Sequence, residues 1–114
     1  MKLLIAGSRS IISFDLTKYV PLQTDLIISG GAQGVDTLAE QYADAHRISK
    51  LILRPQYHIY GRAAPIKRNE SMVEISDVVL IIWDGISKGT KHTISYAEKQ
   101  GKTVTVVTVR RESK

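Results

Sequence analysis

Short apolar runs alternate with amphipathic stretches along this chain, a pattern typical of strands and helices that follow one another. Five apolar runs predict strands over residues 2–6, 25–29, 50–54, 77–83 and 103–109. Apolar residues recur at helical spacing over 12–20, 34–46, 65–76 and 90–100, which predicts helices there. The longest irregular stretch is expected at 56–64, and a loop of that length in a small domain more often serves function than idles.

The alternation indicates the fold. Continuous apolar strands separated by helices are typical of a parallel sheet covered on both faces. Right-handed crossovers leave few topologies, and the order 3-2-1-4-5 is favoured. We therefore expect an α/β protein, a single-domain three-layer Rossmann-like sandwich with a five-stranded parallel sheet. Residues 1–109 would form this domain, and residues 110–114 a basic C-terminal tail.

Composition mainly excludes classes of protein. With 43% hydrophobic and 24% charged residues, the chain of 114 residues fits a globular protein and not a disordered one. No apolar run approaches the roughly 20 residues of a membrane span, and the N-terminal run is too short for a secretion signal, so we expect a cytoplasmic protein without membrane contact. The absence of cysteine excludes disulfides, thiolate zinc sites and cysteine nucleophiles. The three histidines lack metal spacing, so neither a metal nor a cofactor is implied.

The net charge of +5 favours an anionic partner such as a nucleotide or nucleic acid. In open parallel sheets, ligands bind at the carboxyl ends of the strands, where this chain places three glycine-bearing loops. The candidate binding residues in those loops are Gly7, Ser8, Arg9, Gly30, Gly31, Ala32, Gln33, Gly34, Asp36, Trp83, Asp84, Gly85, Ser87, Gly89 and Thr90.

Two of these loops run into helix N-termini. Glycine lets the backbone approach an anion closely, and the free N–H groups of a first helical turn favour negative charge. We therefore expect phosphate to bind at residues 30–34 and again at Gly89 and Thr90. The alternatives are that the glycines only make tight turns and that Thr90 is only an N-cap.

Charged residues complete the candidate site. Arg68, beside Asn69 near the start of the third predicted helix, could fork a phosphate or remain a surface charge. Asp36 and Asp84 could each hold a ribose hydroxyl, although Asp36 could equally be an acid that a first helical turn favours. Ser8 has no apparent His and acid partners, so a serine hydrolase is not indicated.

Four segments, taken together and in order, resemble the SLOG superfamily. They are G-S-R at 7–9, S-G-G-A-Q-G-V-D at 29–36, R-N-E-S-M at 68–72 and W-D-G-I-S-K-G-T at 83–90. The superfamily is named for the DNA-uptake protein Smf (DprA) and the plant cytokinin-activating protein LOG, and the closest branch is the small YspA-like proteins related to YpsA. The resemblance, over residues 2–109, implies a Rossmann-like domain that binds a nucleotide or nucleotide-derived phosphate ligand, as a sensor or a nucleotide-processing protein.

The resemblance also implies narrower alternatives. LOG enzymes are phosphoribohydrolases, which cleave the N-glycosidic bond of a nucleoside 5′-monophosphate. They use an arginine, which Arg68 matches, and a glutamate, which Thr93 replaces in this chain. If this chain hydrolyses a glycosidic or phosphate-ester bond, Arg68 and Asp84 are the candidate catalytic residues, and Asp36 is the other carboxylate that could substitute for the glutamate. The Smf branch binds single-stranded DNA, and its S-G-x-A-x-G-I-D and R-N motifs are echoed at 29–36 and 68–69. Apart from the resemblance, the apolar helix faces of so small a sandwich favour a homodimer.

Overall fold

The computed structural model describes residues 1–110, so residues 111–114 of the predicted basic tail lie outside the described part. The elements follow in the order β1 (Lys2–Gly7), β2 (Leu26–Ser29), α1 (Val35–Ala45), β3 (Ser49–Ile52), α2 (Tyr57–Tyr60), the 3-10 helix η1 (Gly61–Ala63), α3 (Ala64–Ile75), β4 (Val78–Trp83), α4 (Lys88–Lys99) and β5 (Thr103–Thr108). Between residues 1 and 110, no helix has the length and apolar character that a membrane crossing requires.

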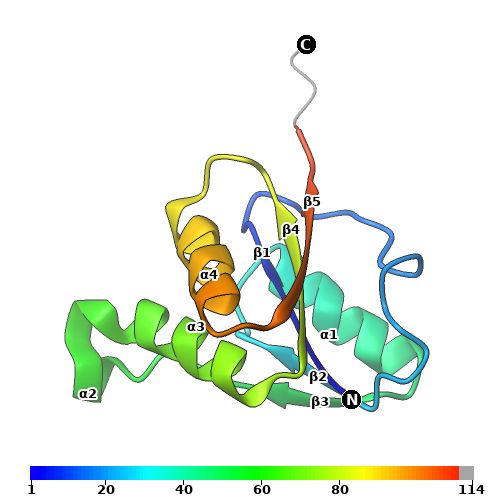
Figure 1. Ribbon diagram of the computed structural model, residues 1–114, viewed down its shortest axis with the longest axis horizontal. Helices are drawn as coiled ribbons and strands as arrows, with labels where there is room; N and C mark the ends of the chain where they lie inside the picture. Colours follow the sequence, from blue (N-terminus) through cyan, green and yellow to red (C-terminus); the bar gives the residue numbers. More distant parts are fainter. Residues whose placement is uncertain (111–114) are drawn as a thin grey trace.

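The five strands form one parallel sheet in the order β3-β2-β1-β4-β5, which confirms the predicted Rossmann-like topology. In the centre of the sheet, Leu4 of β1 lies opposite Ile28 of β2 and Val79 of β4. Helix α1 covers one face, and α3 and α4 cover the other (Figure 1). The carboxyl ends of the strands therefore share one edge, from which the loops 8–10, 30–34 and 84–87 emerge.

The core lies on both faces of the three central strands. Leu3 and Ile5 pack into a cluster under α1, whereas Leu4 and Ala6 pack into a second cluster under α3 and α4. Successive side chains of a strand point to opposite faces, so a strand covered on both sides must be apolar throughout. The edge strands β3 and β5 are mostly exposed, so the predicted cover on both faces holds for the centre of the sheet alone.

The predicted helix over 12–20 is wrong, because residues 8–25 form turns and coil. The buried apolar side chains in this segment are Ile11 and Leu16, which are five residues apart, whereas Ile12 is 81% exposed. One face of a helix would bury residues three or four apart. The carboxylate of Asp15 accepts the backbone N–H of Thr17 at 2.9 Å, a local turn that competes with helix formation.

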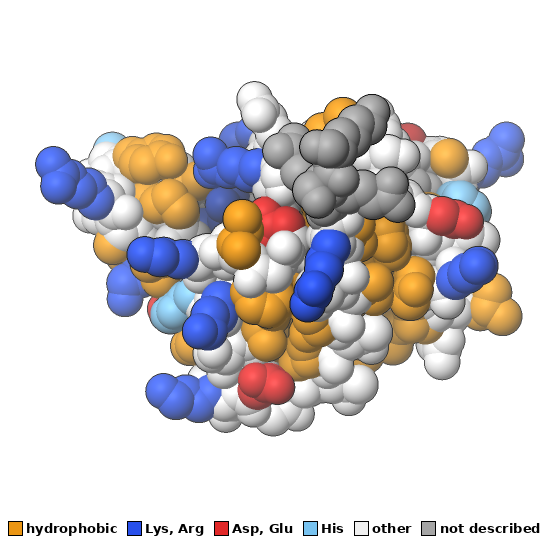
Figure 2. Space-filling model, turned by 90° about the horizontal axis from the view of Figure 1, so that it is seen from above, with side chains coloured by type: hydrophobic (Ala, Val, Ile, Leu, Met, Phe, Trp, Pro, Cys, Tyr) orange, Lys and Arg blue, Asp and Glu red, His pale blue; other side chains and the backbone are white. Residues whose placement is uncertain are grey.

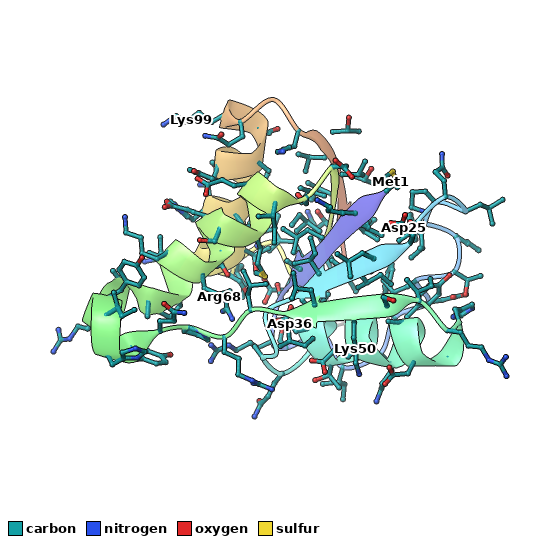
Figure 3. All side chains as sticks on the ribbon, turned by 90° about the horizontal axis from the view of Figure 1, so that it is seen from below. Met1, Asp25, Asp36, Lys50, Arg68 and Lys99 are labelled. Atoms are coloured by element: carbon teal, nitrogen blue, oxygen red, sulfur yellow. The ribbon has the colours of Figure 1, made fainter. Side chains whose placement is uncertain are left out.

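The predicted irregular stretch at 56–64 is also wrong, since it contains α2 and η1. Neither element buries a residue. Together they extend from the N-terminus of α3 away from the sheet (Figures 1 and 3). Helix α4 begins at Lys88, with Ser87 and not Thr90 in the N-cap position. The remaining helices and strands lie within two residues of their predicted bounds.

Candidate functional site

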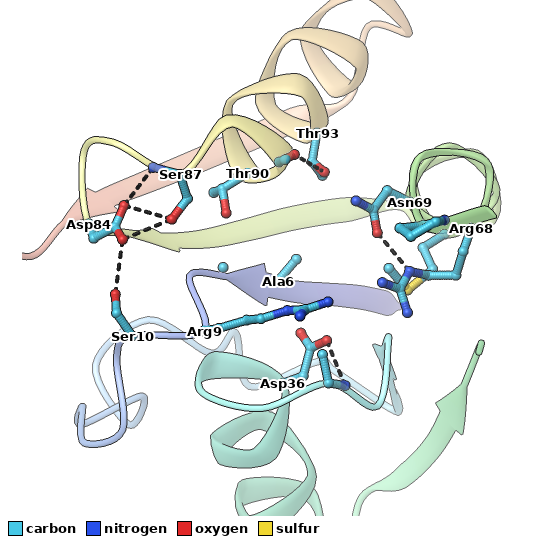
Figure 4. Close-up of a pocket in the computed structure, with 15 residues that line it drawn as sticks. Ala6, Arg9, Ser10, Asp36, Arg68, Asn69, Asp84, Ser87, Thr90 and Thr93 are labelled. Carbon is cyan, nitrogen blue, oxygen red and sulfur yellow. Dashed lines mark hydrogen bonds between the residues drawn. The ribbon is translucent and has the colours of Figure 1, made fainter. Parts of the chain in front are cut away.

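A cavity of about 470 Å³ opens at the carboxyl edge of the sheet, above β1 and β4 (Figure 4). Its walls come from the loop after β1, the start of α1, the middle of α3 and the start of α4. Ten of the predicted binding residues line it, namely Gly7, Arg9, Ala32, Asp36, Arg68, Asn69, Asp84, Ser87, Gly89 and Thr90. The structure therefore brings residues from all four recognised segments to one cavity.

Seven of the predicted binding residues do not line this cavity, namely Ser8, Gly30, Gly31, Gln33, Gly34, Trp83 and Gly85. Packing explains two of the glycines. Gly34 has a φ of 75°, and a Cβ there would lie 2.5 Å from the carbonyl oxygens of Ser8 and Arg9. A Cβ on Gly30 would lie 2.7 Å from Nη1 of Arg68. These glycines let two loops and a buried guanidinium pack closely, whether or not an anion binds.

Five further residues line the cavity without having been predicted as binding residues: Ala6, Ser10, Pro65, Met72 and Thr93. Pro65 and Met72 lie three residues before and four residues after Arg68, so they share its face of α3. Thr93 follows Gly89 by one helical turn. Helical spacing from the predicted residues could have identified these three.

Arg68 is a buried cation on the cavity wall, with 9% of its surface exposed. Its Nη1 donates to the carbonyl oxygens of Gly30 at 2.6 Å and Leu53 at 3.2 Å, and its Nε donates to Oδ1 of Asn69 at 2.7 Å. Within residues 1–110 it forms no salt bridge, and its Nη2 makes no hydrogen bond. Burial lowers the pKa of this guanidinium, which nevertheless stays protonated in proteins. The site thus holds a largely desolvated positive charge without a direct ion pair, which the nearby carboxylate of Asp36 only partly compensates.

Asp36 is the buried carboxylate of the site, with 7% exposure. Its Oδ2 accepts the N–H of Ala32 at 3.1 Å, whereas Oδ1 accepts no hydrogen bond from any described residue. Burial raises the pKa of Asp36, and the Ala32 N–H and the positive charges of Arg68 and Arg9 only partly oppose that effect. Figure 4 shows the Arg9 side chain reaching across the cavity beside Asp36. One carboxylate oxygen is therefore free to accept a hydroxyl or amine proton.

We expect Asp36→Asn to stabilise the unliganded protein by a few degrees of melting temperature at pH 7. The amide keeps an acceptor for Ala32 but removes a charge whose burial is unfavourable. The contribution of Asp36 to wild-type stability falls as pH rises from the ordinary pKa of 3.8 through the raised pKa, because its carboxyl binds more protons in the folded state within that window. The difference in melting temperature between Asp36→Asn and wild type should therefore be small at pH 3.5 and grow towards pH 7. Thermal melts across pH measure it, and a variant less stable than wild type at pH 7 would contradict this assignment.

Asp84 closes the loop after β4 (Figure 4). Its Oδ1 accepts the N–H groups of Ile86 at 3.0 Å and Ser87 at 2.8 Å, and its Oδ2 accepts the hydroxyl of Ser10 at 2.9 Å. Desolvation alone would raise the pKa of Asp84, but these hydrogen bonds and that from the Ser87 hydroxyl hold it well below its usual range. Asp84 therefore shapes the loop, and a catalytic role would require some of these bonds to break.

The N-terminus of α4 faces the cavity with its first N–H groups free. The Ser87 hydroxyl donates to Asp84 and does not cap the helix. In the described part of the chain, the backbone N–H groups of Lys88, Gly89 and Thr90 have no acceptor, and the hydrogen-bond ladder begins with Lys91. A Cβ on Gly89 would meet no atom within 4 Å. The open space and the free N–H groups make this a suitable place for an anion.

The remaining predicted residues form other contacts. Ser8 is buried, and its hydroxyl accepts the N–H of Asp84 at 2.9 Å. Trp83 and Gly85 border a separate shallow hollow beside β5, and the indole of Trp83 donates to the carbonyl of Ser87 at 3.1 Å. Over residues 1–110, His, Asp and Glu nowhere gather in a group of three or more that could hold a metal ion.

Comparison with known proteins finds a similar phage protein. The chain is 33% identical over 82 residues to the Gene 61 protein of Mycobacterium phage D29, and the match covers 67% of this chain. It spans 66% of the phage protein, slightly less than two thirds of that protein's length. No family model matches the chain, and no solved structure matches it significantly. The chain is therefore similar to a phage protein, and its resemblance to the SLOG superfamily stays a prediction.

Proposed function

We propose that the main cavity binds a nucleotide or nucleotide-derived phosphate ligand. The observation that carries this proposal is Arg68, a cation that is nine-tenths buried without a salt bridge in residues 1–110. Burying a charge without a direct ion pair is costly; Asp36 offsets part of that cost, and an anionic ligand at Nη2 would offset more of it. Its guanidinium is held in place by Gly30, Leu53 and Asn69, so it needs no reordering before it binds.

The start of α4 supports the same proposal from the other wall. Three free N–H groups, the positive end of the helix dipole and the hydroxyl of Thr90 border the cavity there. Phosphate oxygens accept several hydrogen bonds at once, which suits this arrangement better than it suits a neutral ligand. Arg9 adds a second cation at the rim.

The rest of the cavity suits a sugar and a base. Its volume of about 470 Å³ falls within the roughly 300–1,000 Å³ usual for small-molecule sites. The free carboxylate oxygen of Asp36 can accept a hydrogen bond from a ribose hydroxyl, and Pro65 offers apolar surface to a base. The combination of cations, free N–H groups, one free acceptor and apolar surface fits a nucleotide.

Gly89→Asp tests the proposal without disturbing the fold. A Cβ at Gly89 meets no atom within 4 Å, and an acid in the first turn favours a helix, so the variant should fold at least as well as wild type. Its carboxylate would occupy the anion position and repel a phosphate. We expect the affinity for a 5′-mononucleotide, measured by calorimetry with all four bases, to fall at least about 30-fold, or roughly 2 kcal/mol.

Ser95→Asp is the matched control, because it introduces the same charge at an exposed position of the same helix away from the cavity. It should bind nucleotides as wild type does. The proposal fails if no mononucleotide, ADP-ribose or NAD binds to the wild-type protein in a saturable way, or if both variants retain full affinity.

The narrower alternatives stay predictions. A hydrolase would have Asp36 as the carboxylate with a free oxygen at the cavity, in addition to the predicted Arg68 and Asp84. Chromatography of mononucleotides incubated with the protein would reveal a released base or nucleoside, and Asp36→Asn should remove that activity. Single-stranded nucleic acid as a partner, the homodimer and the cytoplasmic location likewise stay predictions.

A further inference from the structure

A second cavity, of about 270 Å³, lies beside the main one at the end of β3. Arg68 lines both cavities, so its side chain forms part of a shared wall. The other polar residues of the second cavity are Arg54, Gln56, Tyr60, Lys67 and Ser71. Three cations border this small space, and among residues 1–110 no carboxylate does.

The segment that supplies most of the lining of this cavity is rich in positive charge, and three of its cations, Arg54, Lys67 and Arg68, line the cavity. Residues 45–69 contain six Lys or Arg and no Asp or Glu, whereas the rest of the chain contains ten Lys or Arg and eleven Asp or Glu. Figure 2, which looks onto the carboxyl edge of the sheet, shows Lys and Arg side chains gathered around an apolar patch at one end. Neither Lys67 nor Arg54 forms a salt bridge with a residue in 1–110. Arg54 donates one long hydrogen bond, at 3.3 Å, to the carbonyl of Gly31.

One exposed aromatic ring lines the same cavity, and a second lies in the same short helix. Tyr60 lines it and is 47% exposed, and Tyr57, one helical turn earlier in α2, is 59% exposed. Because α2 buries no residue, these rings contribute little to the core. A solvent-exposed tyrosine beside unpaired cations offers a surface on which a base can stack while its phosphate is held.

We propose that the second cavity is a second phosphate subsite, so that the protein binds two nucleotide units side by side. The proposal rests on the proposed function of the main cavity, since Arg68 borders both sites. One phosphate would bind at Arg68 and the start of α4, and the next between Arg54 and Lys67, with its base against Tyr60. The second phosphate can come from a linked dinucleotide or from a separate mononucleotide.

Calorimetry with 5′-phosphorylated dinucleotides (pNpN) and with the matching 5′-mononucleotides, for all four bases, tests this proposal. Wild type should bind a pNpN at least about tenfold more tightly than the mononucleotide, because two phosphates gain charge-assisted hydrogen bonds. Lys67→Ala should weaken pNpN binding about tenfold and leave the affinity of the first mononucleotide unchanged. Lys99→Ala removes the same charge at the far end of α4 and should change neither affinity.

A stoichiometry of two mononucleotides per chain in wild type and one in Lys67→Ala would support the second subsite. It would also identify a separate mononucleotide as the source of the second phosphate. A pNpN advantage with a stoichiometry of one mononucleotide would identify a linked ligand. If mononucleotides bind but Lys67→Ala and Arg54→Ala both bind pNpN as wild type does, the second subsite is wrong while the main site stands. Binding of neither probe overturns both proposals, and equal weakening of both probes by Lys67→Ala assigns Lys67 to the main site and overturns the second.

Discussion

Gly7→Ala should destabilise the fold by at least about 3 kcal/mol, a large share of the roughly 5–15 kcal/mol that stabilises a small protein. A Cβ at Gly7 would lie 2.0 Å from the carbonyl oxygen of Ile82 and 2.8 Å from Cγ2 of Val35. That carbonyl accepts the N–H of Ser8 at 3.0 Å, so β1 and β4 cannot move apart without losing a sheet hydrogen bond. Urea denaturation followed by circular dichroism measures the loss.

Gly89→Ala is the control for this substitution. It adds the same methyl group at the same cavity but meets no atom within 4 Å, and alanine in a helix is more favourable than glycine by roughly 0.5–1 kcal/mol. We expect this variant to unfold at an equal or higher urea concentration than wild type. If Gly7→Ala unfolds at the same urea concentration as Gly89→Ala, then β1 and β4 do not approach each other as closely as described.

Arg68→Met should lower nucleotide affinity at least about 100-fold, or roughly 2.7 kcal/mol. Methionine occupies a similar volume but removes the charge and the free Nη2. Hydrogen bonds to charged groups contribute roughly 1.5–3 kcal/mol each, and a phosphate at this arginine would form at least one. The nucleotide affinity of Arg68→Lys should lie between those of wild type and Arg68→Met. Lysine keeps the charge and can still donate to the carbonyl of Gly30, but it cannot bind a phosphate with two parallel hydrogen bonds.

Folding has to be measured alongside binding, because Arg68 also satisfies the carbonyls of Gly30 and Leu53. Arg68→Lys supplies a donor for these groups, so a folded Lys variant with weakened binding separates ligand contact from stability. Lys99→Met, which removes a cation from the last turn of α4, should bind as wild type does. Full affinity in Arg68→Met would show that the buried guanidinium serves packing alone.

Periodicity predicted the sheet well because buried parallel strands read as unbroken apolar runs. Leu3, Leu4 and Ile5 are each fully buried, as only a strand covered on both faces would be. The same reasoning failed over 12–20, where apolar residues happen to recur at helical spacing. There a local hydrogen bond of Asp15 and the burial of Ile11 and Leu16 decide the backbone, and neither is visible as periodicity.

The candidate site was predictable as a set of loops but not in its chemistry. Strand ends identified Arg9, Asp84 and Gly89, because topology alone brings such loops to one edge. The sequence could not show that both oxygens of Asp84 accept hydrogen bonds, from its own loop and from Ser10, or that one oxygen of Asp36 accepts none from a described residue. It also could not show that Arg68 is buried without a salt bridge in residues 1–110, since pairing depends on side-chain directions that no spacing specifies.

The two cations of the main cavity differ in how firmly the fold holds their side chains. Arg68 projects from the middle of a twelve-residue helix and is held by three groups, whereas Arg9 projects from the coil of residues 8–25. The backbone beside Arg9 is anchored, because the hydroxyls of Ser8 and Ser10 both bond to Asp84. The exposed Arg9 side chain itself forms no salt bridge with a residue in 1–110. The proposed ligand would therefore find Arg68 already in place and would order the Arg9 side chain, whose lost rotamer freedom would offset part of the energy gained there.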